Sequence, residues 1–400
     1  MRNIVYISYN GMTDPLGESQ VLGYLKLLSK KWRISLISFE KQSNLSDLQR
    51  IRNICEKNEI RFYPLTYHKD PPVLSTVSDI SAGVKKVQSI IENPQETIIH
   101  ARGYIAGMMA LKLYQKCKIP YLFDMRGWMI DERIESGRFN NRYYKPVINV
   151  LRNKEREMIN NAKQIISLTY CAKEKLVDLF KAESKKISII PTCADKDIFR
   201  FDPEERVKAR KELDLPDSAY VLIYSGSVGG YYEPDKMVLF FRCLLERIPD
   251  AYFLFLTKSS KDIVYNNISD DIKSRIRVTS TDYRFVYKYL SASDLGLVLY
   301  NNSFSSTGRS PTKLAEYWYC GLKVAAPANV GDLNRFFADK KGGAQFEQFN
   351  KESFMLAIDE IRSIQTSRSE LAELADKYFS IESGVKSYNE VYEEMFAGGD

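Results

Sequence analysis

The sequence has only two histidines, His68 and His100, in 400 residues. This scarcity argues against a metal centre built from several histidines. The six cysteines are dispersed, and no pair has the spacing of a metal site or a redox motif, so we expect reduced thiols. No apolar run is long enough to cross a bilayer, and the first residues read as a strand rather than a signal peptide. These absences together predict a cytoplasmic protein.

The excess of positive charge is also small. Lysine and arginine number 58 against 51 aspartates and glutamates, which gives a net charge of +7. This small excess and the lack of a recognised binding motif argue against nucleic acid as a partner. The charge fits an anionic small ligand or the anionic inner surface of a membrane. With 44% hydrophobic residues, the chain is long enough for two or three domains with full-sized cores.

Short apolar runs alternate with amphipathic helical stretches through most of the sequence. This alternation is typical of α/β proteins in which parallel sheets are doubly wound with helices. The best junction between two such domains is Pro191–Phe199, and the chain is helical from about Glu352 onward. We predict strands at Ile4–Ser8, Ile34–Phe39, Arg61–Pro64, Thr97–His100, Tyr121–Asp124, Gln164–Leu168, Ile187–Ile190, Tyr220–Tyr224, Tyr252–Thr257, Ile276–Thr279, Leu295–Tyr300 and Lys323–Ala326.

The stretch from Ser305 to Gly321 reads as a loop that turns into a helix. Ser310 is a good N-cap, Pro311 suits the first helical position, and Gly321 is placed to end the helix. A helix N-terminus offers free N–H groups and the positive end of the helix dipole. The loop before this helix can therefore hold a phosphate group.

Charged side chains accompany this helix N-terminus. Arg309 precedes the helix, Lys313 lies in its first turn, and Glu316 sits one turn further on the same face. With backbone amides, the two basic residues could grip a diphosphate, and Glu316 could bind a sugar hydroxyl. The alternative is a capped surface helix with scattered charges.

In doubly wound sheets, ligands bind at the carboxyl ends of the strands. The loop Asn10–Gln20 follows the first strand and carries two glycines around a turn, so it could bring phosphate or an acceptor close to backbone amides. It lacks the dinucleotide fingerprint Gly-x-Gly-x-x-Gly. The alternative is a plain connecting loop, but this loop is longer than the usual span of about 2–6 residues.

Two arginines follow further strands of the first half. Arg102 comes directly after the strand that ends near His100, and Arg126 with Gly127 comes directly after Tyr121–Asp124. A fixed planar guanidinium at such a strand end is suited to clamp a phosphate or carboxylate. The alternative for Arg126 is a structural ion pair with Asp124 or with Asp131.

Strand ends of the second half carry polar groups as well. The loop Ser225–Tyr232 is rich in glycine and serine, which permit close approach of a ligand and donate to its oxygens. Lys258 follows the next strand and could neutralise a phosphate. Tyr283 follows another strand and offers a face on which a nucleobase can stack.

The stretch 138–156 mixes six basic residues with aromatic and aliphatic ones. It could form a basic amphipathic helix that lies on anionic lipid. The alternative is a solvated helix face over a core stripe.

With these pieces in this order, the sequence resembles the family 4 glycosyltransferases, which are retaining enzymes of the GT-B fold. The resemblance covers nearly the whole chain, and its last motif is the most specific. The matching segments are Tyr9-Asn10 through Asp14–Gln20, His100–Arg102, Phe123–Gly127 with Asp131–Arg133, Ile190-Pro191 through Asp197–Phe199, Gly226–Tyr232, and Ser310–Lys313 through Glu316 and Cys320-Gly321.

The resemblance implies two Rossmann-like doubly wound domains that face a central cleft. The N-terminal domain, residues 1–192, would bind the acceptor. A C-terminal helix within 380–400, expected at Ser383–Met395, would cross back to it. Residues 193–379 would form the domain that binds the nucleotide-sugar donor.

One departure from the family pattern lies on the donor helix. Family members typically carry two glutamates there, seven residues apart. Glu316 matches the second, which typically holds the ribose. Gly308 stands at the position of the first, so the contact with the transferred sugar is lost or supplied differently.

Two further departures concern basic residues. Ser227 and the Gly229-Gly230 loop stand where many members carry an arginine and a lysine for the diphosphate. Arg309, Lys313 and Lys258 are the expected substitutes. Arg126 replaces the histidine that many members have after the strand Tyr121–Asp124.

The resemblance implies transfer of a sugar, with retention, from a nucleotide-diphosphate sugar to a glycan or lipid-linked acceptor in bacterial surface polysaccharide or glycoconjugate synthesis. No metal or other cofactor is expected, because basic residues can stabilise the leaving diphosphate. Peripheral contact with the inner membrane would run through 138–156. The expected catalytic residues are Arg126, Arg309 and Lys313; the donor-binding residues are Gly17, Gly226, Ser227, Gly229, Lys258, Tyr283, Ser306, Thr307, Gly308 and Glu316; the acceptor-binding residues are Asp14, Gln20, Arg102, Asp131 and Arg133.

Three alternatives stay open at this point. A two-domain cleft protein could bind an anionic or nucleotide ligand without catalysis. A nucleic-acid binder is disfavoured by the small net charge. A nucleotide-sugar epimerase would need a dinucleotide fingerprint near residue 10, and the sequence has no such fingerprint there.

Overall fold

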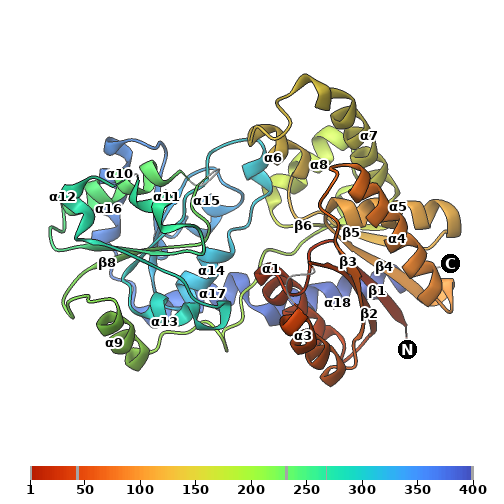
Figure 1. Ribbon diagram of the computed structural model, residues 1–400, viewed down its shortest axis with the longest axis horizontal. Coiled ribbons are helices and arrows are strands. Elements are labelled where there is room, and N and C mark those ends of the chain that lie inside the picture. The colour runs from red at the N-terminus through yellow and green to blue at the C-terminus, as the bar shows by residue number, and fades with distance from the viewer. Residues whose placement is uncertain (1, 42–44, 230–232, 267, 398–400) are drawn as a thin grey trace. The chain divides into compact units, whose positions relative to one another are not determined.

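The computed structural model describes residues 2–41, 45–229, 233–266 and 268–397 (Figure 1). The chain divides into two compact units. Unit 1 consists of Met1–Pro191 and Ile381–Asp400, and unit 2 is Thr192–Ser380. The sequence-based boundaries, 192/193 and 379/380, differ from these by one residue each.

Unit 1 is built on a seven-stranded parallel sheet with the order β3-β2-β1-β4-β5-β6-β7. All seven strands were predicted, with ends that differ by up to two residues. The strands are β1 (Asn3–Ser8), β2 (Arg33–Glu40), β3 (Arg61–Thr66), β4 (Thr97–Arg102), β5 (Tyr121–Asp124), β6 (Gln164–Ser167) and β7 (Ile187–Ile189). The helices are α1 (Pro15–Gly17), α2 (Gly23–Leu28), α3 (Leu45–Lys57), α4 (Leu74–Ile90), α5 (Gly103–Cys117), α6 (Met129–Glu135), α7 (Lys145–Asn161), α8 (Tyr170–Phe180) and α18 (Ile381–Ala397).

Side chains of successive residues in β1 point to opposite faces of this sheet. Val5 and Ile7 belong to the core that α4, α5, α7 and α8 cover. Tyr6 points to the other face, where its ring centroid lies 4.1 Å from that of His100. Each face therefore has its own helical layer.

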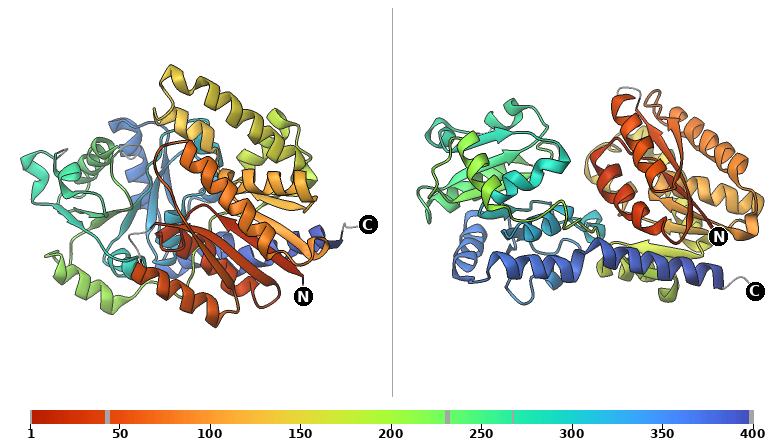
Figure 2. Two further views of the ribbon diagram at one scale, coloured as in Figure 1. Left: turned by 45° about the vertical axis from the view of Figure 1, so that its right-hand side comes forward. Right: turned by 90° about the horizontal axis from the view of Figure 1, so that it is seen from below.

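Helix α18 supplies part of the second layer, although it follows unit 2 in the sequence. It contacts α2, and the Tyr392 hydroxyl lies 2.6 Å from His100 Nδ1. Trp32 Nε1 donates to Asn389 Oδ1 at 2.7 Å. Figure 2 shows this helix, in dark blue, beside the strands and helices of unit 1. The C-terminal crossover helix predicted at Ser383–Met395 is thus present and slightly longer.

Unit 2 is built on a six-stranded parallel sheet with the order β10-β9-β8-β11-β12-β13. Two hydrophobic cores, one on each face, lie between the sheet and its helices. The strands are β8 (Val221–Ser225), β9 (Tyr252–Leu256), β10 (Ile276–Thr279), β11 (Leu295–Leu297), β12 (Lys323–Pro327) and β13 (Gly343–Phe346). The helices are α9 (Pro203–Glu212), α10 (Pro234–Leu245), α11 (Lys261–Tyr265), α12 (Asp270–Lys273), α13 (Val286–Ser291), α14 (Thr312–Tyr319), α15 (Leu333–Phe336), α16 (Lys351–Ser363) and α17 (Arg368–Phe379).

Helix α14 begins later than predicted. Pro311 occupies the N-cap position, and no side chain caps the helix there. The Ser310 hydroxyl instead accepts a hydrogen bond from the Thr192 amide at 3.1 Å. The end of the helix agrees with the prediction, because Gly321 has a φ of +71° and its amide donates to Trp318 O at 2.9 Å.

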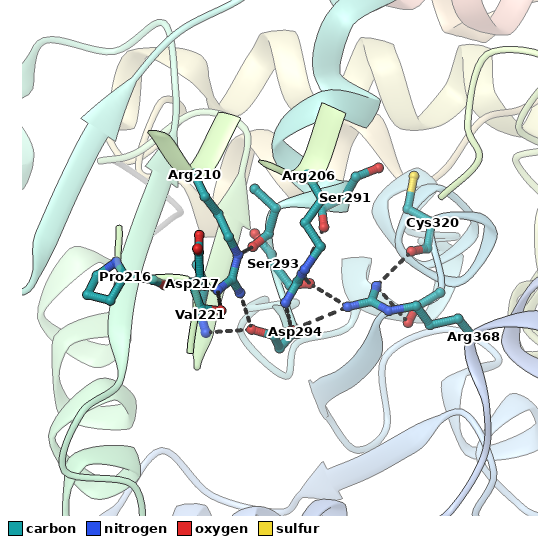
Figure 3. A network of polar contacts seen from close by, with 12 residues as sticks. Arg206, Arg210, Pro216, Asp217, Val221, Ser291, Ser293, Asp294, Cys320 and Arg368 are labelled. Atoms are coloured by element: carbon teal, nitrogen blue, oxygen red, sulfur yellow. Dashed lines mark hydrogen bonds and ion pairs between the residues drawn. The ribbon is translucent and has the colours of Figure 1, made fainter. Parts of the chain in front are cut away.

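Asp294 anchors the N-terminal edge of this sheet (Figure 3). Its Oδ1 lies 2.8 Å from Arg206 and 3.3 Å from Arg368. Its Oδ2 lies 2.9 Å from Arg210 and accepts from the Val221 amide at 2.9 Å. The three guanidiniums also donate to backbone carbonyls, Arg210 to those of Ala292, Pro216 and Asp217. One carboxylate thus ties α9, α17 and the start of β8 to the turn before β11.

Candidate functional site

Unit 1 has a cavity of about 390 Å³ at the carboxyl ends of β1 to β5. Its walls come from the segments that follow these five strands, as expected for a doubly wound sheet. It is lined by Tyr9, Asn10, Gly11, Asp14, Phe39, Lys41, Tyr67, Arg102, Gly103, Tyr104, Ile105, Met125, Arg126, Gly127, Met129, Glu132 and Arg133. Predicted site residues Asp14, Arg102, Arg126 and Arg133 are therefore together in one cavity.

Arg126 is held in an uncommon backbone conformation. Its φ is +59°, and that of Gly127 is +116°. Its side chain is 11% exposed, and Nη1 lies 3.9 Å from Asp124 Oδ1. Burial opposes the charge, but the Asp124 carboxylate keeps the pKa of Arg126 above its ordinary value. Nη2 also donates to Gln20 Oε1 at 3.5 Å, which brings the predicted residue Gln20 to the same group.

Arg102 is the second buried guanidinium of the cavity and is 8% exposed. Its Nε is buried and has no hydrogen-bond partner among the described residues. Burial, and next the charge of Arg126, lower the pKa of Arg102. The buried His100 lies beside Asp124, with Nε2 3.4 Å from Asp124 Oδ2, and burial lowers its pKa as well.

The loop after β1 is fixed by a buried carboxylate that the sequence did not single out. Glu40 accepts from the amide of Met12 at 2.7 Å and from the hydroxyl of Thr13 at 2.9 Å. Asp14 pairs with Lys41, Oδ1 to Nζ, at 2.8 Å. Gly17 is packed so tightly that an added Cβ would lie 2.1 Å from the Gly11 carbonyl oxygen. Close packing is thus a structural reason for this glycine.

Asp131 does not line the cavity. Its Oδ2 accepts from Arg152 Nη1 at 2.9 Å, and the same arginine pairs with Glu155 at 3.0 Å. The neighbouring Arg133 does line the cavity, with its guanidinium 5.6 Å from the Phe139 ring centroid. The ion pair offered as the alternative for Arg126 is thus with Asp124, while Asp131 pairs elsewhere.

An aromatic wall was missed in the sequence. The ring centroid of Tyr9 lies 5.0 Å from that of Phe39 and 5.5 Å from that of Tyr67, and all three residues line the cavity. The Tyr9 hydroxyl donates to Asp79 at 2.9 Å. These rings follow or end three different strands, so only the strand order brings them together.

In unit 2, two predicted basic residues converge beside the N-terminus of α14. Lys313 Nζ lies 4.8 Å from the Tyr224 ring centroid and 5.5 Å from that of Tyr300. The Arg309 guanidinium lies 5.1 Å from the same Tyr300 ring. Gly226 has a φ of +137°, and a Cβ there would lie 2.9 Å from Lys313 Nζ. A glycine at this position leaves room for the ammonium group.

Glu316 is buried one turn along α14 and is 7% exposed. Burial raises its pKa to about 7, against the opposing effect of Lys313. A buried carboxyl whose pKa is raised to about 7, beside a lysine, is typical of a functional site.

Two further predicted donor-binding residues, Ser306 and Thr307, already have hydrogen-bond partners within the protein. The hydroxyls of Ser306 and Thr307 donate to the carbonyls of Ser303 and Phe304, at 2.6 and 2.7 Å. They stabilise the turn that ends at the buried Gly308. The local turn explains these hydroxyls without a ligand.

The glycine-rich loop after β8 carries further predicted residues. The Ser227 carbonyl accepts from the Tyr224 hydroxyl at 2.9 Å, and Gly229 has a φ of +94°. The rest of this loop, Gly230, Tyr231 and Tyr232, lies outside the described residues.

Lys258 and Tyr283 lie at neighbouring strand ends. Lys258 Nζ is 3.7 Å from Asp282 Oδ1, and both side chains are exposed. The half-buried Tyr283 packs edge-on against Phe199, with 5.3 Å between ring centroids. Its packing role is therefore clear from the structure.

Comparison with known proteins gives relatives at low identity. No family model matches the sequence. The chain is 22% identical over 231 residues to the D-inositol 3-phosphate glycosyltransferase of Stackebrandtia nassauensis, and the match covers 54% of this chain and 50% of that protein. The chain thus spans about half the length of this curated relative. The relative fits the family 4 resemblance.

Solved structures match over nearly the whole chain. Sucrose-phosphate synthase from Thermosynechococcus elongatus has a TM-score of 0.73 at 16% identity, covering 99% of this chain and 100% of that one. Anabaena HepE in complex with UDP and glucose has a TM-score of 0.71 at 12% identity, covering 98% and 100%. The chain therefore has the fold of the GT-B glycosyltransferases, as predicted. Among the described residues, none of the helices combines the length and apolarity needed to span a membrane.

Proposed function

We propose that this protein is a glycosyltransferase that uses a nucleotide-diphosphate sugar as donor. The observation that carries the proposal is the grouping of Arg309, Lys313 and the buried Glu316 around the start of α14, beside Gly226, whose lack of a side chain leaves room for the Lys313 ammonium group. Two cations and helix amides suit a diphosphate. HepE, which shares this fold, binds UDP and UDP-glucose, and this supports the choice of donor.

In the proposed mechanism, Arg309 and Lys313 stabilise the diphosphate as its bond to the sugar breaks. Glu316 accepts a hydrogen bond from a ribose hydroxyl. The two cations take the role that a divalent metal has in other transferases, so the reaction proceeds without one. Retention at the anomeric carbon is proposed by analogy with the family that the sequence resembles.

The cavity of unit 1 is the proposed acceptor site, with Arg126 at its floor. A glycan or lipid-linked acceptor of bacterial surface polysaccharide or glycoconjugate synthesis is proposed on the same analogy. Contact with the inner membrane would use the basic stretch 138–156. There Tyr143 is 72% exposed and Val150 59%, close to several lysines and arginines, which supports interfacial binding.

The test measures binding of UDP, GDP, ADP and CMP by calorimetry, followed by turnover with sugars of the nucleotide that binds. We expect one nucleoside diphosphate to bind, and Lys313→Ala to weaken it about tenfold or more. Lys340→Ala, which removes an exposed cation of the same unit paired with Glu360, is the control. Turnover should persist with EDTA.

Each contrary result has a definite meaning. Unchanged turnover in both Arg309→Ala and Lys313→Ala would remove their catalytic assignment. Tight nucleotide binding without transfer to any acceptor would favour the alternative, a protein that binds a nucleotide without catalysis. No binding in a well-folded protein would mean that α14 is only a helix with charged neighbours.

A further inference from the structure

The cavity of unit 1 has two chemically different ends. The strand order β3-β2-β1-β4-β5 lines up the segments that follow these strands along one edge of the sheet. Tyr67, Phe39 and Tyr9 lie at the β3, β2 and β1 positions, and Arg102 and Arg126 lie at the β4 and β5 positions. One end of the cavity, the aromatic end, therefore holds the three rings, which Arg133 also approaches, and the other, the cationic end, holds the two buried arginines.

At the cationic end, positive charge exceeds negative charge among the described residues. Asp124 carries one negative charge against the two positive charges of Arg102 and Arg126. His100 adds no negative charge. The remaining charged groups that line the cavity are Lys41, Arg133, Asp14 and Glu132, which balance one another. The excess of positive charge is thus local to Arg102 and Arg126, because the buried carboxylates Glu40 and Asp79 lie beside Gly11 and Tyr9 at the other end.

Arg102 is the centre of this imbalance. It is 8% exposed, and its Nε is buried without a hydrogen-bond partner among the described residues. Asp124 Oδ1 also has no hydrogen-bond partner there, since Arg126 is 3.9 Å away. Burying a guanidinium without full pairing destabilises the folded protein. A ligand that supplied a hydrogen-bond acceptor to Arg102 would give this guanidinium the pairing that it lacks among the described residues.

The aromatic end suits a sugar ring. Aromatic faces bind the C–H surface of a pyranose by dispersion and burial. Tyr9 and Tyr67 are both half-buried. The Tyr9 hydroxyl donates to Asp79, which fixes the position of this ring. A ring held there would present one substituent towards the arginines.

We propose that unit 1 binds a sugar that carries an anionic group, with the ring against Tyr9 and Tyr67 and the anion on Arg102 and Arg126. The anion is a phosphate monoester or a carboxylate. The inference rests on the proposed function, because this sugar would be the acceptor or the part of it next to the reacting hydroxyl. Arg102 is a binding residue in this proposal.

The experiment uses the full chain and three sugars: glucose 6-phosphate, glucuronic acid and glucose. Inorganic phosphate is a fourth probe. Binding is followed by calorimetry and by the shift in melting temperature. We expect at least one anionic probe to bind at least tenfold more tightly than glucose, because guanidinium–oxyanion hydrogen bonds are charge-assisted. The phosphate ester should weaken as pH falls below about 6, whereas the uronate should not.

Variants separate the two ends of the cavity. Arg102→Met should abolish binding of the anionic probes. Tyr67→Leu should weaken glucose 6-phosphate severalfold and leave inorganic phosphate unchanged. The matched control is Arg33→Gln, which removes an exposed arginine at the opposite edge of the same sheet. It should bind all probes like the wild type.

A further readout distinguishes binding from a structural role. If Arg102 is present for a ligand, Arg102→Met removes an unbalanced buried charge and should raise the melting temperature of the ligand-free protein. A lower melting temperature would make Arg102 structural and overturn the proposal. Equal affinity for glucose and glucose 6-phosphate, or no response to any anionic probe, would overturn it as well. Nucleotide binding measured in the same samples is independent, so its loss counts only against the proposed transferase activity.

Discussion

Glu316 links protonation to stability at the scale of a single residue. Its pKa in the folded protein is about 7, above the ordinary value of 4.5. Between these two values the folded state holds a proton that the unfolded state releases. The stabilisation from this bound proton is therefore fully present below pH 4.5 and is lost as pH rises through 7. We expect the free energy of unfolding to fall by about 3 kcal/mol over this range.

The prediction is that Glu316→Gln removes this pH dependence. The variant should match the wild type in free energy of unfolding at pH 4.5 and exceed it at pH 8. Urea unfolding at several pH values measures the difference. Parallel stability profiles for the two proteins would show that the carboxyl titrates at its ordinary pKa.

Single residues also show where sequence reasoning reaches its limit. A serine before a proline is chemically suited to cap α14, yet Ser310 binds Thr192 instead, from a segment 118 residues earlier. Asp131 has a chemically suitable partner in Arg126, yet it pairs with Arg152. The predicted cap at Ser310 is therefore wrong, and the partner of Asp131 is an arginine that the sequence did not indicate. Their partners depend on tertiary proximity, which local sequence does not contain.

Asp294 decides how several elements of unit 2 are held together. Its carboxylate is shared by Arg206, Arg210 and Arg368 and also accepts from the Val221 amide. These contacts lie at the N-terminal edge of the sheet, away from the strand ends that carry the candidate donor site. Their role is to join α9, β8, β11 and α17.

We predict that Asp294→Ala destabilises the protein by about 3–5 kcal/mol, because it leaves the buried Arg210 and the partly buried Arg206 and Arg368 without their shared counter-charge. Chemical unfolding is the measurement. Asp271→Ala is the control, since it removes an exposed carboxylate paired with Arg242 and should cost at most about 1 kcal/mol. Equal effects of the two substitutions would contradict the assigned role.

Elements with a strong apolar pattern were predictable, and a weak one was not. Strands β1 to β12 each contain apolar residues in a run or in alternation, and all were anticipated, although β3 has no fully buried residue. Strand β13 has only four residues and starts at Gly343, where an added Cβ would lie 1.9 Å from the Val324 carbonyl oxygen. Its pairing with β12 requires this close approach. Because glycine is not typical of strands, the residue that allows the pairing also makes the strand hard to predict from the sequence.

At the scale of the whole molecule, strand order determines which residues meet. The basic strand ends of unit 1 could be anticipated because each directly follows an apolar run. The aromatic wall could not, because Tyr9, Phe39 and Tyr67 come together only in the order β3-β2-β1. The contact of Tyr392 with His100 joins residues 292 positions apart. The family resemblance predicted the helix but not this contact.

Because the two units have separate hydrophobic cores, we predict two calorimetric unfolding transitions. Asp294→Ala should lower one of them. Tyr392→Leu, which removes one of the hydrogen-bond partners of His100 in unit 1, should lower the other. The nucleoside diphosphate that binds should raise the transition that Asp294→Ala lowers, and an anionic sugar that binds should raise the one that Tyr392→Leu lowers. If both ligands raised the same transition, the assignment of donor and acceptor to different units would be wrong.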